Sequence, residues 1–153
     1  MKKQEDVNFQ HARKKEQIMI MKKALENKNC PFCWDVIEKY HPKKILKKGN
    51  WWWLSENGWF YEGAEIQFIF FYKKHIATIK EIETEAFTEL HELIKWVEET
   101  YKLKWCSLFI RSGEMNGTGS SVQHIHAQLI SGNSTKREDS EALKVKLGYK
   151  KKK

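Results

Sequence analysis

The chain has 153 residues, of which 41% are hydrophobic and 31% charged, a balance typical of one globular domain that can bury a core without disulfides. No apolar run approaches the roughly 18–20 residues that cross a bilayer, and the polar N-terminus lacks the apolar segment of a secretory signal, so we expect a soluble, cytoplasmic protein with no membrane partner. A formal net charge of +8 predicts affinity for anions such as phosphates, nucleotides or nucleic acid.

Apolar periodicity and turn signals predict these elements in chain order: an amphipathic helix over 9–26, strands over 44–54 and 66–72, a helix over 85–101, and strands over 105–111 and 125–130. Gly49-Asn50 is a candidate hairpin turn, and Thr84 a candidate N-cap. A glycine-rich loop, 112–121, separates the last two strands. Because strands and helices do not alternate as in a dinucleotide-binding fold, we predict an α+β fold with helices packed on an antiparallel sheet.

Aromatic residues are abundant, with seven tryptophans, three of them consecutive at 51–53. Such rings form large contacts in a core, and they also stack on nucleobases. The composition alone leaves both interpretations open.

The densest group of polar residues follows the glycine-rich loop, where His124, His126 and Gln128 alternate with apolar residues. On a strand this alternation places all three polar side chains on one face. An imidazole can attack phosphorus and form a covalent intermediate, a glutamine amide can donate to the transferring group, and a glycine- and serine-rich loop offers backbone N–H groups to phosphate oxygens. The pattern predicts a phosphoryl- or nucleotidyl-transfer site.

Cys30 and Cys33 form a C-x-x-C motif, which is typical of a zinc knuckle or of a redox pair. A redox site would be expected in a thioredoxin-like βαβ unit, and none follows in the sequence. His41 is one candidate third ligand for a zinc knuckle that binds nucleic acid, although no fourth ligand lies near it. Cys106 is expected in the core, and His11 and His91 at the surface.

The segment GTGSSVQHIHAQLI resembles the signature of the histidine triad superfamily, with Gln128 where a third histidine usually stands. This variant is similar to the branch that contains dinucleoside tetraphosphate phosphorylases and galactose-1-phosphate uridylyltransferases. The resemblance implies a histidine triad-like catalytic domain over 28–131, an N-terminal helical extension over 1–27 and a charged C-terminal tail over 132–153. It also implies a homodimer.

The resemblance further implies roles for individual residues. Structural Zn²⁺ would be bound by four of them: Cys30, Cys33, His75 and His124. His126 would be the nucleophile and Gln128 its catalytic partner. The nucleotide-binding residues would be Asn57, at the ribose, and Gly119, Ser120 and Ser121, at the phosphates. Gly113 stands where many relatives have a phosphate-binding amide side chain, a contact for which Arg111 and Asn116 are candidate substitutes.

Together these features predict a nucleotidyl transferase or hydrolase that acts on nucleotide conjugates, such as dinucleoside polyphosphates, through a covalent nucleotidyl-histidine intermediate. The alternative is a zinc-bearing protein that binds nucleotides or nucleic acid without turnover. The basic charge and the lysine-rich C-terminus favour the alternative.

Overall fold

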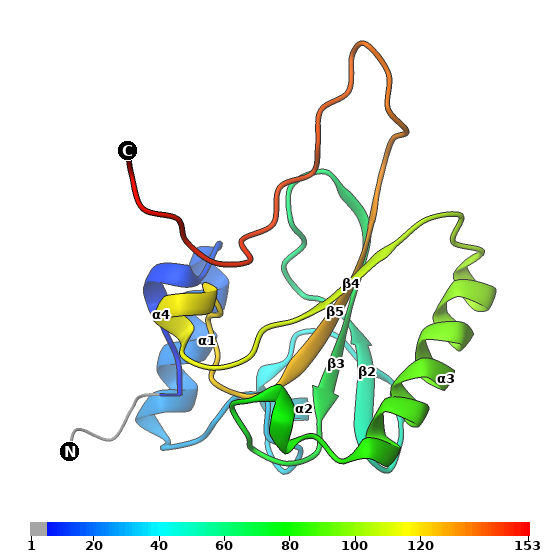
Figure 1. Cartoon of the computed structure of the whole chain (residues 1–153). Coiled ribbons are helices and arrows are strands. Elements are labelled where there is room, and N and C mark those ends of the chain that lie inside the picture. Colours follow the sequence, from blue (N-terminus) through cyan, green and yellow to red (C-terminus); the bar gives the residue numbers. More distant parts are fainter. Residues whose placement is uncertain (1–5) are drawn as a thin grey trace.

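The computed structural model describes residues 6–153 (Figure 1), so residues 1–5 of the predicted N-terminal extension lie outside the described part. The elements are η1 (Phe9–His11), α1 (Lys15–Glu26), α2 (Ile37–Tyr40), β1 (Ile45–Lys48), β2 (Trp52–Glu56), β3 (Ala64–Tyr72), η2 (Ile79–Glu81), α3 (Thr84–Tyr101), β4 (Ser107–Ile110), α4 (Met115–Thr118) and β5 (His126–Gly132). Among the described residues, no helix is long and apolar enough to cross a membrane.

The strands form one antiparallel five-stranded sheet in the order β1-β2-β3-β5-β4. The predicted α+β fold is therefore confirmed. Its central pair, β3 and β5, joins the apolar run at 66–72 to the strand that carries His126 and Gln128, with Phe71 opposite His126 and Ile69 opposite Gln128.

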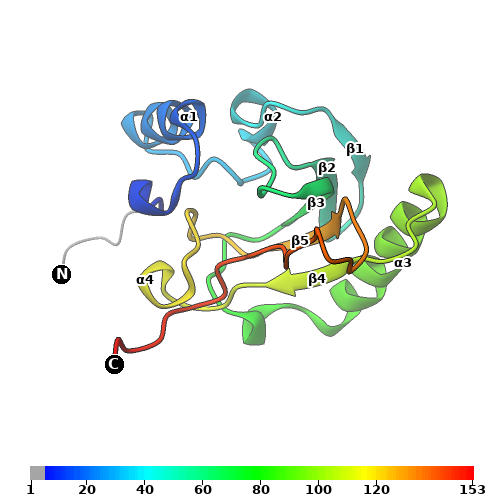
Figure 2. The ribbon, with the colours of Figure 1, turned by 90° about the horizontal axis from the view of Figure 1, so that it is seen from above.

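Side chains on β3 alternate between two buried environments. Phe68, Phe70 and Tyr72 pack in the main core beneath α3, whereas Ile69 and Phe71 belong to a second cluster with α2 on the opposite face. Figure 2 shows α3 on one side of the sheet and α2 on the other. Burial on both faces explains why this strand is a nearly continuous apolar run.

Several predicted boundaries differ from the structure. The helix predicted over 9–26 begins at Lys15 and follows the separate 3₁₀ turn η1. Thr84 was wrongly predicted as an N-cap, because it is the first residue of α3 and Glu83 occupies the capping position without a side-chain hydrogen bond. The hairpin at Gly49-Asn50 is confirmed, since it separates β1 from β2.

The three consecutive tryptophans are structural. Trp52 is fully buried, and its indole N–H donates to the Ala86 carbonyl at 2.8 Å. Trp53 stacks on Trp34, with ring centroids 4.6 Å apart, and Trp51 stacks on Tyr72. These contacts favour the core interpretation of the aromatic excess.

Glu89 joins α3 to the β1–β2 turn. Its carboxylate accepts hydrogen bonds from three successive backbone N–H groups, those of Asn50 at 2.6 Å, Trp51 at 2.7 Å and Trp52 at 2.8 Å. A Cβ on Gly49 would lie 2.7 Å from the same carboxylate. Glu89 therefore holds the turn, and a side chain at position 49 would have to displace its carboxylate.

Replacing Glu89 with Ala is expected to lower the free energy of unfolding by about 2 kcal/mol or more, because three backbone donors lose a charged acceptor. Chemical denaturation monitored by tryptophan fluorescence measures the loss. Glu99→Ala, an exposed change on the same helix, is the control, expected within about 0.5 kcal/mol of the parent. Equal stability of the two variants would contradict the role assigned to Glu89.

Candidate functional site

A pocket opens on the sheet face opposite α3. His126, Gln128 and Ile69 line it from the sheet, and residues of the N-terminal segment, α1 and the glycine-rich loop complete it. Because Ala127 and Leu129 are buried in the core beneath α3, the alternation along β5 directs His126 and Gln128 to the other face, as predicted.

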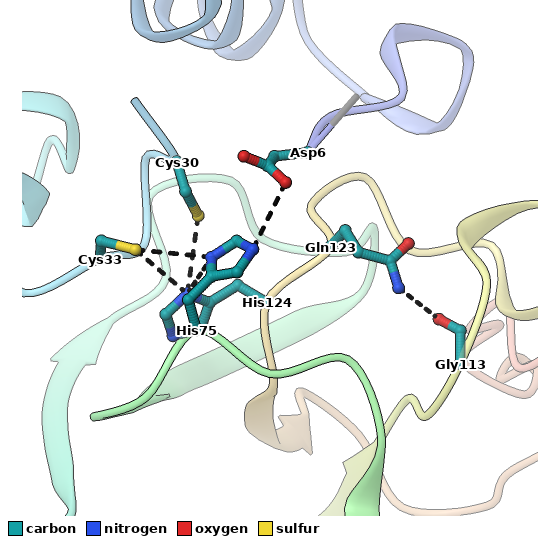
Figure 3. A network of polar contacts seen from close by, with 7 residues as sticks. All are labelled: Asp6, Cys30, Cys33, His75, Gly113, Gln123 and His124. Carbon is teal, nitrogen blue, oxygen red and sulfur yellow. Dashed lines mark hydrogen bonds and ion pairs between the residues drawn. The ribbon is translucent and has the colours of Figure 1, made fainter. Parts of the chain in front are cut away.

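Beside the pocket, Cys30, Cys33, His75 and His124 bring one ligand atom each within 4.8 Å of one another (Figure 3). The two Nδ1 atoms are 3.3 Å apart, and three sulfur–nitrogen distances are 3.5, 3.6 and 3.7 Å. A tetrahedral ion with ordinary zinc bond lengths needs about 3.3 Å between two nitrogens and about 3.6 Å between nitrogen and sulfur. The donor set therefore fits a tetrahedral metal ion.

The second ring nitrogen of each histidine has a partner outside the cluster. His124 Nε2 lies 2.8 Å from the Tyr72 carbonyl oxygen, and His75 Nε2 lies 3.4 Å from a carboxylate oxygen of Asp6. Both partners favour a proton on Nε2, which leaves the Nδ1 lone pair directed at the cluster. Such outer contacts orient histidine ligands in metal sites.

Within the cluster the two thiols differ. The hydrogen bond from the Cys30 thiol lowers the pKa of Cys33, and the same contact, together with burial, raises the pKa of Cys30. Without a metal, a proton on His75 Nδ1 donates to the Cys33 thiolate, which raises the pKa of His75, and a bound metal ion would displace that proton. One thiolate is thus already favoured in the protein alone. His41 lies outside the four-residue cluster, which disfavours the nucleic-acid knuckle.

His126 is oriented by the backbone carbonyl of His124, two residues earlier in the chain. Its Nδ1 lies 2.7 Å from the His124 carbonyl oxygen, which can only accept, so Nδ1 carries the proton and Nε2 carries the lone pair. Every fully buried polar side-chain atom in the described residues has a hydrogen-bond partner. Nε2 has none there, so it must reach the pocket.

Burial lowers the pKa of His126 to about 4, and the positive charges of Arg111 and Arg13 act in the same direction. The imidazole is therefore neutral near pH 7. A neutral imidazole with its lone pair in a pocket can act as a nucleophile.

Two backbone N–H groups determine the orientation of the Gln128 side-chain amide, each by orienting a second side-chain amide that donates to it. The Tyr61 N–H donates to Gln67 Oε1 at 2.8 Å, so the Gln67 amino group must point the other way, and it donates to Gln128 Oε1 at 2.6 Å. The Trp59 N–H fixes Asn57 in the same manner, and Asn57 Nδ2 donates to Gln128 Oε1 at 3.2 Å.

The side-chain carbonyl oxygen of Gln128 consequently accepts two hydrogen bonds. Its amino group has no hydrogen-bond partner in the described part of the chain. Because no fully buried polar side-chain atom there lacks a partner, this amino group is accessible and reaches the pocket. The site thus presents a bare imidazole nitrogen and an amide donor two residues apart on one strand face.

The glycine-rich loop reaches the pocket through Gly119 and Ser121. Gly119 ends α4 in the left-handed region, at φ 79°. Ser120 is turned inward, because its hydroxyl donates to the Val122 carbonyl at 2.9 Å. Gly113 offers no side chain, and its carbonyl accepts from Gln123 (Figure 3). Of the two candidate substitutes, Arg111 lines the pocket and Asn116 does not.

Sequence reasoning missed part of the site. His11 was expected at the surface, but it is half-buried in the pocket wall and its Nδ1 lies 2.7 Å from the Ser120 carbonyl oxygen. His41 also lines the pocket, and its Nε2 lies 2.8 Å from Ser55 Oγ. His91 is exposed, as predicted, whereas Cys106 is only partly buried at the core. Periodicity carries no signal for either residue, because His11 ends the short 3₁₀ turn η1 and His41 follows the single-turn helix α2.

Neither a family model nor a curated protein matches the sequence. Among solved structures, a HIT family hydrolase from Clostridium thermocellum is similar, with a TM-score of 0.57 and 23% identity over 73% of this chain and 97% of that one. A histidine triad nucleotide-binding protein from Candida albicans has a TM-score of 0.55 and 17% identity over 74% and 87% of the two chains.

A third structure, a histidine triad protein from Clostridium difficile, has a TM-score of 0.54 and 15% identity over 72% of this chain and 96% of that one. At these identities the likeness establishes the fold. The chain has the α+β fold of the histidine triad proteins.

A pH experiment tests the interior position of His41. Burial lowers its pKa to about 4, below the value of about 6.5 expected in the unfolded chain. The unfolded state therefore binds the proton first as the pH falls, and the stability contributed by neutral His41 is complete above pH 6.5 and is lost between pH 6.5 and 4.

Between pH 7 and pH 5 the free energy of unfolding of the parent is expected to fall by about 2 kcal/mol more than that of His41→Gln, which has no titrating imidazole at position 41. Urea denaturation of both proteins at the two pH values measures the difference, and the other titrating groups cancel between them. Parallel losses in the two proteins would show that His41 titrates normally.

Proposed function

We propose that the protein transfers or hydrolyses the nucleotidyl group of nucleotide conjugates, such as dinucleoside polyphosphates, through a covalent intermediate on His126. The observation that carries the proposal is the pairing of a bare, neutral Nε2 on His126 with an outward-facing amino group on Gln128 in one pocket. Similar folds in proteins described as a hydrolase and as a nucleotide-binding protein support it.

In the first step His126 Nε2 attacks the α-phosphorus. A nitrogen–phosphorus bond forms, the bond from phosphorus to the leaving group breaks, and the leaving group departs with the electron pair. The Gln128 amino group donates to a non-bridging oxygen as charge develops there. In the second step an oxygen of water or of an acceptor phosphate attacks phosphorus and the phosphorus–nitrogen bond breaks. Its electron pair returns to Nε2, which restores the neutral imidazole, and an attacking water loses its proton to the solvent.

The remaining pocket residues divide between phosphate and nucleoside. Gly119, Ser120 and Ser121 form the loop proposed to hold phosphate oxygens. Asn57, which is 6% exposed, is proposed to bind the ribose with its second amide proton. The apolar residues that line the pocket are proposed to contact the base: Ile20, Met21, Pro31, Phe32 and Ile69.

The metal cluster is proposed to bind structural zinc through Cys30, Cys33, His75 and His124. Four protein ligands complete a tetrahedral shell, so the ion would tie the segment at Cys30 to the residues before β5 and leave no open position for substrate. When bound, zinc supplies rigidity to the backbone carbonyl of His124 that orients His126.

Purified protein is expected to hold one zinc per chain. The Cys30→Ser, Cys33→Ser double variant is expected to hold almost none and to unfold at a lower temperature, because metal-binding free energy contributes to folding. Elemental analysis and thermal denaturation provide the two measurements. Cys106→Ser, outside the cluster, is the control. Full zinc in the double variant would contradict the site.

His126→Ala is expected to reduce turnover of nucleotide conjugates by about 10³-fold or more, because the covalent route is lost. Gln128→Ala is expected to reduce it by about 10²–10³-fold. Both should keep full zinc and a normal fold, and exposed His91→Ala is the control. Rapid quenching with an α-labelled conjugate should trap acid-labile label on the parent and none on His126→Ala.

Near-normal turnover by His126→Ala, or label on another residue, would contradict the mechanism. Binding without turnover of any conjugate would favour the alternative, a nucleotide- or nucleic-acid-binding zinc protein. Gln128 in place of a third histidine is the reason to include added phosphate and sugar phosphate as acceptors in the assay. The cytoplasmic location, the homodimer and the division at residues 27 and 131 remain predictions.

A further inference from the structure

The pocket carries positive charge without a compensating acid. Arg13 and Arg111 both line it, and within residues 6–153 no Asp or Glu does. Neither catalytic step described above uses the two arginines.

Arg13 comes from the N-terminal segment, just before α1. Its guanidinium lies 3.9 Å from the centre of the Tyr61 ring and donates to the Trp59 carbonyl. Burial of this group lowers the pKa of Arg13, and the charge of Arg111 acts in the same direction. The residue as a whole is exposed, and its guanidinium is held against Tyr61 and the Trp59 carbonyl.

Arg111 follows β4 and approaches the same tyrosine from another side. Its Nη2 donates to the Tyr61 hydroxyl at 2.8 Å, and its Nε donates to the Lys146 carbonyl at 3.0 Å. Tyr61 is itself nearly buried, at 9% exposure. Two guanidinium groups thus contact the same buried tyrosine, one at its ring and one at its hydroxyl.

Every partner of these arginines is neutral. In the part of the chain that the structure describes, they contact backbone carbonyls, a hydroxyl and aromatic rings, and neither forms an ion pair. Two like charges held together without a carboxylate repel each other. A bound anion would remove that repulsion, and the planar donors of arginine match phosphate oxygens.

The segment that carries Arg13 is fixed to the glycine-rich loop, which is proposed to hold phosphate oxygens. Val7 pairs with Val122 in an antiparallel bridge, the Asn8 N–H donates to the Ser121 carbonyl at 2.8 Å, and His11 reaches Ser120. Figures 1 and 2 show this blue segment beside α4 and the loop before β5. Arg13 is therefore held at the pocket by backbone contacts rather than by its own charge.

We infer that Arg13 and Arg111 form an anion subsite for phosphate oxygens beyond the phosphorus that His126 attacks. The preferred conjugate then has a further phosphate, as in a polyphosphate chain, rather than an uncharged leaving group such as an amine. This inference rests on the proposed function for its place in the reaction. The binding of an anion by the two arginines can be tested without turnover.

The binding test uses inorganic tripolyphosphate and isothermal titration calorimetry on the full chain. Arg13→Gln is expected to weaken binding by about 10-fold or more, because a hydrogen bond to a charged group is stronger than one between neutral groups. Arg111→Lys, which keeps the charge and loses the paired donors, is expected to weaken it less. Arg137→Gln removes the same charge from an exposed position and is the matched control.

Equal affinity of Arg13→Gln and the parent would overturn the inference, as would an equal loss in Arg137→Gln, which would mean that only net charge matters. Circular dichroism of each variant establishes that it is folded. Because tripolyphosphate is bound and not turned over in this measurement, a failure here is distinct from a failure of the proposed nucleotidyl transfer.

The kinetic test compares kcat/KM for a dinucleoside polyphosphate and for a nucleoside phosphoramidate. The ratio of the two values is expected to fall about 10-fold or more in Arg13→Gln, because the variant loses its contact with the charged leaving group. An unchanged ratio would overturn the inference. Phosphoramidate turnover that inorganic phosphate accelerates in the parent, and not in Arg13→Gln, would instead place an acceptor phosphate on the same arginines.

Discussion

The antiparallel pairing of β3 with β5 determines which side chains enter the core and which reach the pocket. Ala127 and Leu129 join the aromatic core beneath α3, while His126 and Gln128 face the other way, opposite Phe71 and Ile69. A shift of one residue in this register would turn the two catalytic candidates into the core beneath α3 and the apolar pair towards the pocket. The large core beneath α3 thus holds the chemistry in place, although none of its residues touches the pocket.

Backbone groups orient the side chains of the site, because a carbonyl oxygen can only accept a hydrogen bond and an N–H group can only donate one. The His124 carbonyl fixes the tautomer of His126, the Tyr72 carbonyl fixes that of His124, and the Tyr61 N–H fixes Gln128 through Gln67. In each case a rigid main-chain donor or acceptor leaves one side-chain atom available for a metal or substrate. This preorganisation lowers the cost of arranging donors when charge develops in the reaction.

The sequence predicted those parts of the site that obey local rules. The alternation at 124–128, the C-x-x-C spacing and the loop before β5 are short-range patterns, and the structure places His126 and Gln128 on one face with the predicted cluster beside them. The N-terminal segment and its Arg13 could not be predicted in this way. Its position depends on a single bridge to Val122 and on backbone contacts across more than one hundred residues. Gln67 was missed for a similar reason, because its function depends on which partner lies across the sheet.

The central claim is that His126 Nε2 becomes covalently bonded to phosphorus, and the stereochemical course at phosphorus tests it most directly. A conjugate made chiral at the α-phosphorus with sulfur and an oxygen isotope would be converted to product and its configuration determined by ³¹P NMR. Two successive in-line displacements, first by His126 and then by the acceptor, predict net retention of configuration. Net inversion would mean that the acceptor attacks phosphorus directly, and it would contradict the account.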